Sequence, residues 1–139
     1  MIYTTNYARI KKLPNNIIPI SIVAKCPNWY KGQEYKKLAP KIGFWKEWEK
    51  TKDNIYYIKE FKSQVLDKLN VNNVIIELLQ KIGNDKGLDN LPNIALICYE
   101  PKPPEDMPYR EIIKTEKYFC HRHLVSRWFN INGIYTKEF

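Results

Sequence analysis

Two apolar runs that lack polar alternation predict buried β-strands. The first covers residues 17–24, is rich in β-branched residues, and has Pro19 near its start, where the loss of one N–H is tolerated. The second covers residues 93–99 and is followed directly by Glu100. This pattern is typical of parallel strands that are covered on both faces. Residues 3–10 are mixed in character and predict a short strand or an entry segment.

Apolar residues at helical spacing predict helices between and after these runs. One spans residues 55–69, and Asp53 or Asn54 can cap it. The next spans residues 74–82, with Asn72 or Asn73 as its cap and Gly83 and Asn84 as its exit. Three shorter or later elements complete the prediction: a helical turn or two at 44–50, a polar loop at 85–93, and a short helix within 109–118.

The final helix is predicted to begin at Cys120, to turn Leu124, Val125 and Trp128 inward, and to end at 130–133. Strands alternating with helices predict a single α/β domain over residues 1–139, with a mostly parallel sheet flanked by helices. A right-handed crossover would set the two strands parallel. It would bring the loop at 25–31 beside Cys98 and Glu100.

The net charge of +8 is unevenly distributed along the chain. Residues 1–62 contain 13 Lys and Arg against 5 Asp and Glu, whereas residues 63–139 contain 10 of each. A basic half is compatible with a phosphate-bearing partner, from a nucleotide to nucleic acid. Because 19 of the 23 basic residues are lysine, an AT-rich genome would give the same bias through codon usage.

Three cysteines form an odd number without framework spacing, and the first residues have no signal-peptide pattern. We therefore expect a cytoplasmic protein with reduced thiols. No apolar run approaches the ~20 residues that a membrane helix needs, so no membrane partner is expected.

The unusual chemistry gathers at the end of the second strand and the start of the last helix. Cys120 would lie where unpaired N–H groups and the helix dipole favour an anion, and Arg122 would add to that field. Cys98 and Glu100 would face this pocket as a thiol and a carboxylate. The catalytic candidates are Cys98, Glu100 and Cys120, and the ligand-binding candidates are Lys25, Trp29, Tyr30, Lys31, His121 and Arg122.

Several structural interpretations compete with these roles. Cys98 could be a small core residue instead of a nucleophile. Arg122 could form an ion pair with Glu100 instead of binding an anion. His123 and Arg127 are expected on an exposed face. Zinc is disfavoured because no cysteine pair has the C-x2–4-C spacing. The aromatic residues at 44–48 fit packing better than base stacking.

A phosphatase loop is disfavoured as well, because it needs an arginine six positions after Cys120. Ser126 stands there. The chain has neither a Walker A loop nor a G-x-G-x-x-G fingerprint.

The motifs Cys98-Tyr99-Glu100 and Cys120-His121-Arg122, with Trp128, resemble the DUF488 family of small, largely uncharacterised proteins. Upstream, residues 27–32 and 38–40 add to the likeness. The resemblance implies a compact, Rossmann-like α/β domain without an established activity. Residues 101–118 stand where the family has a shorter gap, which suggests an inserted lid or a surface loop.

The leading hypothesis is that the protein binds a nucleotide or another phosphorylated small molecule at this pocket, with possible hydrolase or transferase activity. One alternative is a nucleic-acid-associated module that uses the basic, aromatic-rich first half. Another is a thiol-redox protein, which requires Cys98 and Cys120 to lie close together. No cofactor is predicted, and both a monomer and a homodimer are compatible with the sequence.

Overall fold

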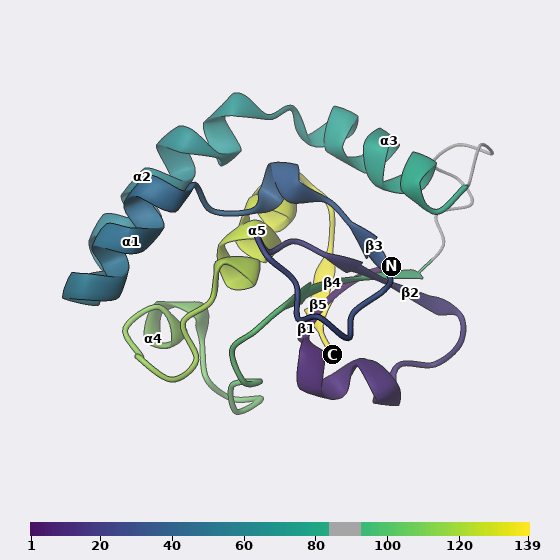
Figure 1. The fold of residues 1–139 in the computed structure, drawn as a ribbon, viewed down its shortest axis with the longest axis horizontal. Coiled ribbons are helices and arrows are strands. Elements are labelled where there is room, and N and C mark those ends of the chain that lie inside the picture. Colours follow the sequence, from purple (N-terminus) through teal and green to yellow (C-terminus); the bar gives the residue numbers. More distant parts are fainter. Residues whose placement is uncertain (84–92) are drawn as a thin grey trace.

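The computed structural model describes residues 1–83 and 93–139, and these contain a parallel sheet of five strands (Figure 1). The strands lie in the order β3-β2-β4-β1-β5, and every neighbouring pair is parallel. Their bounds are β1 (Ile2–Asn6), β2 (Ile17–Ser21), β3 (Gln33–Glu34), β4 (Asn93–Cys98) and β5 (Thr136–Glu138). The predicted α/β class with a sheet flanked by helices is confirmed.

β4 is the central strand, and both of its faces are buried. Ile94 and Leu96 face the main core, whereas Ala95 and Ile97 face a smaller core on the other side of the sheet. A strand with two buried faces needs apolar side chains at every position, which explains the uninterrupted apolar run. The prediction that the 17–24 and 93–99 runs pair in parallel is confirmed by β2 and β4.

The main core is covered by helices that pack apolar side chains against it (Figure 1). They are α1 (Ile42–Thr51), α2 (Asn54–Gln64), α3 (Val71–Lys81) and α5 (His121–Ile131), and short 3-10 segments lie at Tyr7–Lys12, Lys36–Leu38 and Leu66–Lys68. The smaller core is covered by the 3-10 helix Tyr7–Lys12 and the loop that follows β2.

Two helix starts test the predicted caps. Asp53 caps α2 by accepting from the Tyr56 N–H at 3.1 Å, as predicted. The cap of α3 is Asn70, whose side chain accepts from the Asn73 N–H at 3.1 Å, so the predicted cap at Asn72 or Asn73 is wrong. Asparagines stand at positions 70, 72 and 73, and each is a suitable cap residue. The sequence alone therefore does not decide which of them is the cap.

The sequence pattern missed β5 and left β1 undecided. β1 is an inner strand that pairs with both β4 and β5, although four of its five residues are not aliphatic. Thr4 is buried, and this is tolerated because its hydroxyl donates a hydrogen bond to the Glu138 carboxylate at 2.6 Å. The predicted loop at 85–93 lies almost entirely outside the described residues.

The segment 101–118 contains the short helix α4 (Tyr109–Ile112) and packs on the main core through Tyr109 and Ile113. The Asn54 side chain donates to the Ile113 and Thr115 carbonyls at 2.8 and 3.0 Å and accepts from the Trp48 indole N–H at 2.9 Å. These bonds fasten the segment to α1 and α2. No helix in residues 1–83 or 93–139 is long and apolar enough to cross a membrane.

Candidate functional site

A cavity of about 640 Å³ lies where β2 and β4 end. These strands are neighbours, but the chain leaves β2 for β3 at one edge of the sheet and leaves β4 for β5 at the other edge. Ligands of parallel α/β proteins bind at such switch points, outside the carboxyl ends of the strands. The volume is within the usual range for a small-molecule site.

The cavity wall is mainly aromatic and apolar, with charged groups of both signs. The loop after β2 contributes Lys25, the end of β4 contributes Cys98 and Glu100, and the start of α5 contributes Cys120 and His121. The remaining wall includes Trp45, Trp48, Glu49 and Lys52 from α1 and its C-cap, with Tyr57, Glu116 and Phe119. The loop at 25–31 was predicted to lie beside Cys98 and Glu100, and its first residue, Lys25, shares the cavity wall with them.

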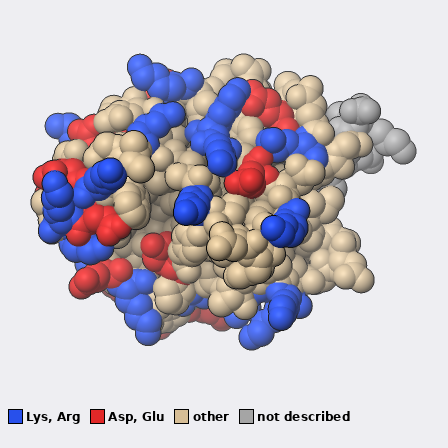
Figure 2. Space-filling view, in the orientation of Figure 1, with Lys and Arg blue, Asp and Glu red and all other residues tan. Residues whose placement is uncertain are grey.

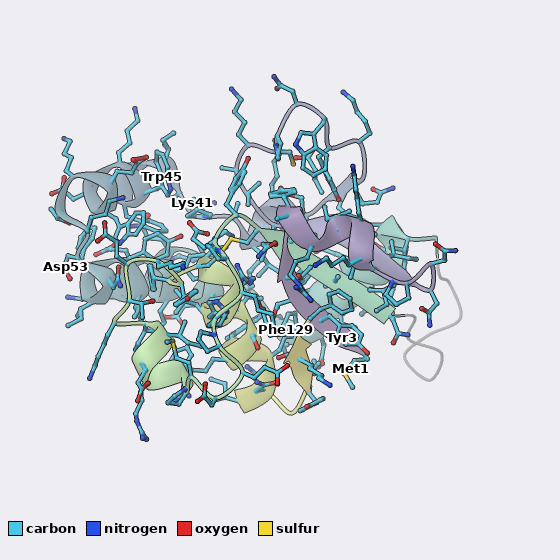
Figure 3. All side chains as sticks on the ribbon, turned by 90° about the horizontal axis from the view of Figure 1, so that it is seen from below. Met1, Tyr3, Lys41, Trp45, Asp53 and Phe129 are labelled. Atoms are coloured by element: carbon cyan, nitrogen blue, oxygen red, sulfur yellow. A yellow bond between two sulfur atoms is a disulfide. The ribbon has the colours of Figure 1, made fainter. Side chains whose placement is uncertain are left out.

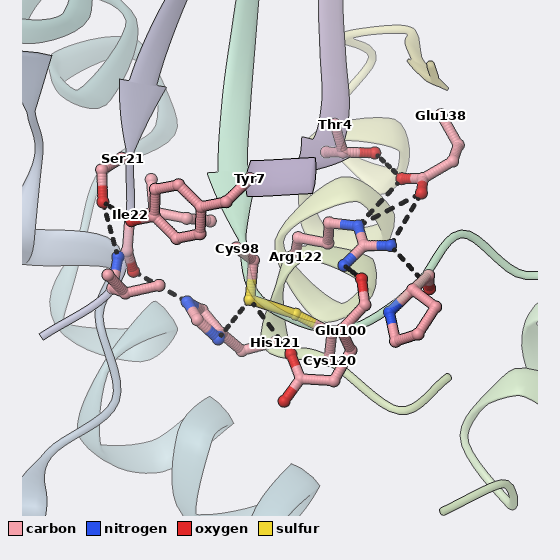
Figure 4. Close-up of a disulfide and its surroundings, with 12 residues drawn as sticks. Thr4, Tyr7, Ser21, Ile22, Cys98, Glu100, Cys120, His121, Arg122 and Glu138 are labelled. Atoms are coloured by element: carbon pink, nitrogen blue, oxygen red, sulfur yellow. Dashed lines mark hydrogen bonds and ion pairs between the residues drawn. A yellow bond between two sulfur atoms is a disulfide. The ribbon is translucent and has the colours of Figure 1, made fainter. Parts of the chain in front are cut away.

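Cys98 and Cys120 form a disulfide between β4 and α5 (Figure 4). Figure 3 shows the disulfide in yellow near the start of α5, on the side of the molecule where Trp45 is labelled. The expectation of reduced thiols is therefore wrong for these two cysteines, and Cys26 alone is a free thiol. Sequence spacing could not show the pair, because 22 positions separate the two cysteines and the fold brings them together.

His121 is held between β2 and the disulfide (Figure 4). Its Nε2 lies 2.7 Å from the Ile22 carbonyl oxygen, which only accepts, so Nε2 carries the proton. Its Nδ1 therefore presents a lone pair, and this atom lies 3.3 Å from Cys98 Sγ. Burial lowers the pKa of His121 to about 4, so the imidazole is neutral at pH 7.

Glu100 lies on the cavity side of the disulfide. Its Oε2 is 3.5 Å from Cys98 Sγ. Burial raises the pKa of the Glu100 carboxyl, and the positive charges of Arg122 and Lys52 oppose this shift only in part. A carboxyl group with a raised pKa beside a sulfur atom is suited to exchange a proton with it.

Arg122 was predicted to help bind an anion in the cavity, but it is not among the residues that line the cavity. The side chain is 0% exposed and points away from the disulfide toward Glu138 and Thr4 (Figure 4). Its Nη2 donates to Glu138 at 2.8 Å, Nε donates to both Glu138 oxygens, and the guanidinium also donates to the Glu100 and Pro101 carbonyls. The ion pair foreseen as the alternative exists, but its carboxylate belongs to Glu138 rather than Glu100.

His123 is buried, and the expectation that it lies on an exposed face is wrong, whereas Arg127 is exposed as expected. Burial, together with the Arg122 charge, lowers the pKa of His123 to about 4. Its Nε2 has no hydrogen-bond partner among the described residues. The helical pattern misplaced His123 because α5 is covered on more than one face.

Three of the candidates from the loop after β2 lie away from the cavity. Among the residues that the structure describes, the lining includes Lys25 but not Trp29, Tyr30 or Lys31. The Trp29 and Tyr30 rings pack edge-on against Tyr7 at the smaller core, and Trp29 is 59% exposed. Lys31 is exposed. Trp29, Tyr30 and Lys31 were predicted to bind the ligand, but they do not line this cavity.

The sequence assigned the aromatic residues at 44–48 to packing, and this is correct for Phe44, which is buried, and for Trp48, which packs against the main core. Trp45 and Trp48 line the cavity, and the Lys52 ammonium lies 4.2 Å from the centre of the Trp48 ring. The sequence did contain an indication that one of these aromatic residues would reach a cavity. Aromatic residues at i, i+1 and i+4 cover more than one face of a helix. A helix that buries Phe44 must therefore direct a second aromatic residue elsewhere.

The Lys and Arg side chains do not merge into one patch in the view of Figure 2, where acidic groups stand between several of them. The nucleic-acid hypothesis stays a prediction.

Comparison of the chain with protein-family models, with curated proteins and with solved structures finds no match. The resemblance to the DUF488 family accordingly stays a prediction, and the function has to be argued from the site.

Proposed function

We propose that this domain is a thiol–disulfide redox protein that acts on a small disulfide or dithiol bound in the cavity. The observation that carries the proposal is the Cys98–Cys120 pair in the cavity wall, with His121 Nδ1 and the Glu100 carboxylate beside Cys98 Sγ. A purely structural disulfide needs neither a cavity nor polar groups beside its sulfur atoms.

The proposed partner is a small molecule because both cysteines are buried and line the cavity. The two cysteines are 1% and 3% exposed, which excludes direct contact with a flat protein surface. The aromatic wall favours a partner with apolar or aromatic groups next to its sulfur atoms.

The exchange proceeds in two balanced steps. In the reduced protein, the Cys120 thiol at the amino end of α5 loses its proton to water, and its thiolate attacks one sulfur of the small disulfide. The sulfur–sulfur bond of the small disulfide breaks, and the first small thiolate leaves and takes up that proton from water. The Cys98 thiol then gives its proton to Glu100, and its thiolate attacks Cys120 Sγ. The second small thiolate leaves and takes the proton from Glu100. Two protein thiols are oxidised and one small disulfide is reduced to two thiols.

A redox titration tests the proposal. The protein is equilibrated in glutathione buffers, the free thiols are alkylated, and each cysteine is quantified by peptide mass spectrometry. We expect one two-electron transition that Cys98→Ser or Cys120→Ser abolishes and Cys26→Ser leaves in place. A pair that stays oxidised in the most reducing buffer, or reduced in the most oxidising one, would refute the proposal.

A nucleotide-sized ligand is the second candidate, and the position of the cavity favours it. The cavity lies at the switch point of the sheet, with two indoles and two lysines, Lys25 and Lys52, in its wall. Three carboxylates in the same wall offset the lysines, which is why this candidate comes second.

The chain provides matched controls for a thermal-shift test with nucleotides. Trp45→Ala and Lys25→Ala should reduce the shift, whereas Trp29→Ala and Lys31→Ala, which lie outside the cavity, should not. Absence of a shift in the wild type, or equal losses in both pairs, would count against a nucleotide in this cavity.

A further inference from the structure

We propose that the reduced Cys98 and Cys120 thiolates and Nδ1 of His121 together bind one divalent ion of the zinc class, whose fourth position faces the cavity. The two sulfur atoms and a ring nitrogen of His121 all lie within 4.8 Å of one another. Ligand atoms on one tetrahedral zinc ion are separated by roughly 3.3–3.8 Å, given bond lengths of about 2.0–2.3 Å. Small side-chain rotations are enough to reach that arrangement.

The orientation of His121 is the second observation that supports an ion. A histidine that binds zinc through one nitrogen generally donates the other N–H to a carbonyl or carboxylate, which fixes the ring and the tautomer. The Ile22 carbonyl is that acceptor at 2.7 Å, and Nδ1 is aimed at Cys98 Sγ. The ring is thus already held in the orientation and tautomer that a metal ligand needs.

Charge and burial are also compatible with a bound ion. Two thiolates and a neutral imidazole cancel the charge of a divalent ion, so the complex can occupy a buried position without a net charge. The Cα atoms of the cysteines are 7.2 Å apart, and rotation of the two side chains can place the sulfur atoms on either side of one ion.

The fourth position would be open, because both cysteines and His121 line the cavity. Zinc sites with three protein ligands and one open position are those that activate water or a substrate. Glu100 lies at the edge of this position and would accept a proton from the bound water. The spacing rule did not predict the site because its ligands come from the separate elements β4 and α5.

Metal binding and the disulfide exclude each other, since each uses both sulfur atoms. The inference shares the dithiol state with the redox proposal, but neither requires the other. A pair that titrates without binding metal would overturn only this inference, and a pair that binds metal but never forms a disulfide would refute only the redox proposal.

The experiment is anaerobic titration of the reduced protein with cobalt(II), which gives thiolate charge-transfer bands in the near ultraviolet and visible bands typical of a tetrahedral site. We expect one ion per chain. Cys98→Ser, Cys120→Ser and His121→Ala should each raise the cobalt Kd at least about 100-fold, because loss of an outer-shell partner alone costs 10–100-fold. Cys26→Ser should leave the Kd unchanged. No stoichiometric binding, or binding that is unaffected in both cysteine variants, would overturn the inference.

Two measurements on the wild type test the inference even if the variants do not fold. Zinc should protect Cys98 and Cys120, but not Cys26, from alkylation in the reduced native protein. Free zinc at 100 times its Kd should shift the glutathione equilibrium about 100-fold toward the dithiol, or roughly 60 mV for two electrons. Equal alkylation of all three cysteines, or an equilibrium that zinc does not move, would overturn the inference.

Discussion

Replacing Glu138 with glutamine should lower the free energy of unfolding by about 3 kcal/mol. The Arg122 guanidinium is fully buried and would keep its charge after losing its carboxylate partner. Either orientation of the new amide would place N–H groups against N–H groups of Arg122, because both Glu138 oxygens accept from the guanidinium. Burial alone would raise the pKa of Glu138, but the Arg122 hydrogen bonds and charge outweigh this and lower it, so Glu138 is ionised at pH 7.

The magnitude follows from how deeply the pair is buried. Removing one partner of a buried ion pair generally costs 3–5 kcal/mol, and the Glu138 side chain is still 20% exposed, so we take the lower end, about 3 kcal/mol. For a chain of this length such a loss lowers the Tm by roughly 10 °C. Urea unfolding followed by circular dichroism measures the free energy, and a thermal scan measures the Tm.

The matched control is Glu105→Gln, which removes a carboxylate that is 92% exposed and 4.0 Å from Lys102. Its effect should stay within about 0.5 kcal/mol. A double variant, Arg122→Met with Glu138→Leu, should recover much of the loss, since it removes both buried charges. If Glu138→Gln were no more costly than Glu105→Gln, the ion pair would not stabilise the fold, and an anion-binding role for Arg122 would have to be reconsidered.

Two further predictions concern buried polar groups. Burial lowers the pKa of His121 and His123 to about 4, below the ordinary value of 6.5, so the unfolded chain takes up protons first and stability falls as the pH drops from 6.5 toward 4. The free energy of unfolding should change by roughly 2 kcal/mol per pH unit near pH 5, and a flat profile in urea unfolding would contradict this. Asn54→Ala should cost about 2–3 kcal/mol, because it leaves the Ile113 and Thr115 carbonyls without their donor. Hydrogen exchange should then speed up in residues 113–118, and unchanged exchange there would argue against this fastening.

The two apolar strands could be predicted from the sequence because each carries its own signal. Five of six residues in β4 and three of five in β2 are buried, which favours apolar residues at successive positions, and this requirement is local. β1 lacks such a signal, since Thr4 and Asn6 are polar yet buried. The partner that makes Thr4 acceptable is Glu138, which is 134 positions away along the chain, so no local pattern could reveal it.

The candidate site could be predicted at the level of elements but not of side-chain directions. Parallel strands end at one edge of a sheet, and this rule was enough to bring Lys25, Cys98 and Glu100 together. The rule could not decide between Trp29 and Trp45, because both stand in aromatic, lysine-rich segments. Which of them reaches the cavity depends on the face of the sheet that each segment covers.

The first turn of α5 explains why the site and the fold depend on each other. Cys120 is the N-cap and has an extended backbone, whereas His121 and Arg122 are successive helical residues that point about 100° apart, so the three side chains reach three different strand ends. Cys120 is joined to the end of β4, His121 donates to the carbonyl that follows β2, and Arg122 holds Glu138 at the end of β5. Arg122 also fixes the Glu100 carbonyl, and thereby the position of the residue whose carboxylate lies beside Cys98. A substitution that loosens Arg122 should therefore change the chemistry of a thiol that Arg122 does not touch, through the placement of Glu100 rather than through a contact with a ligand.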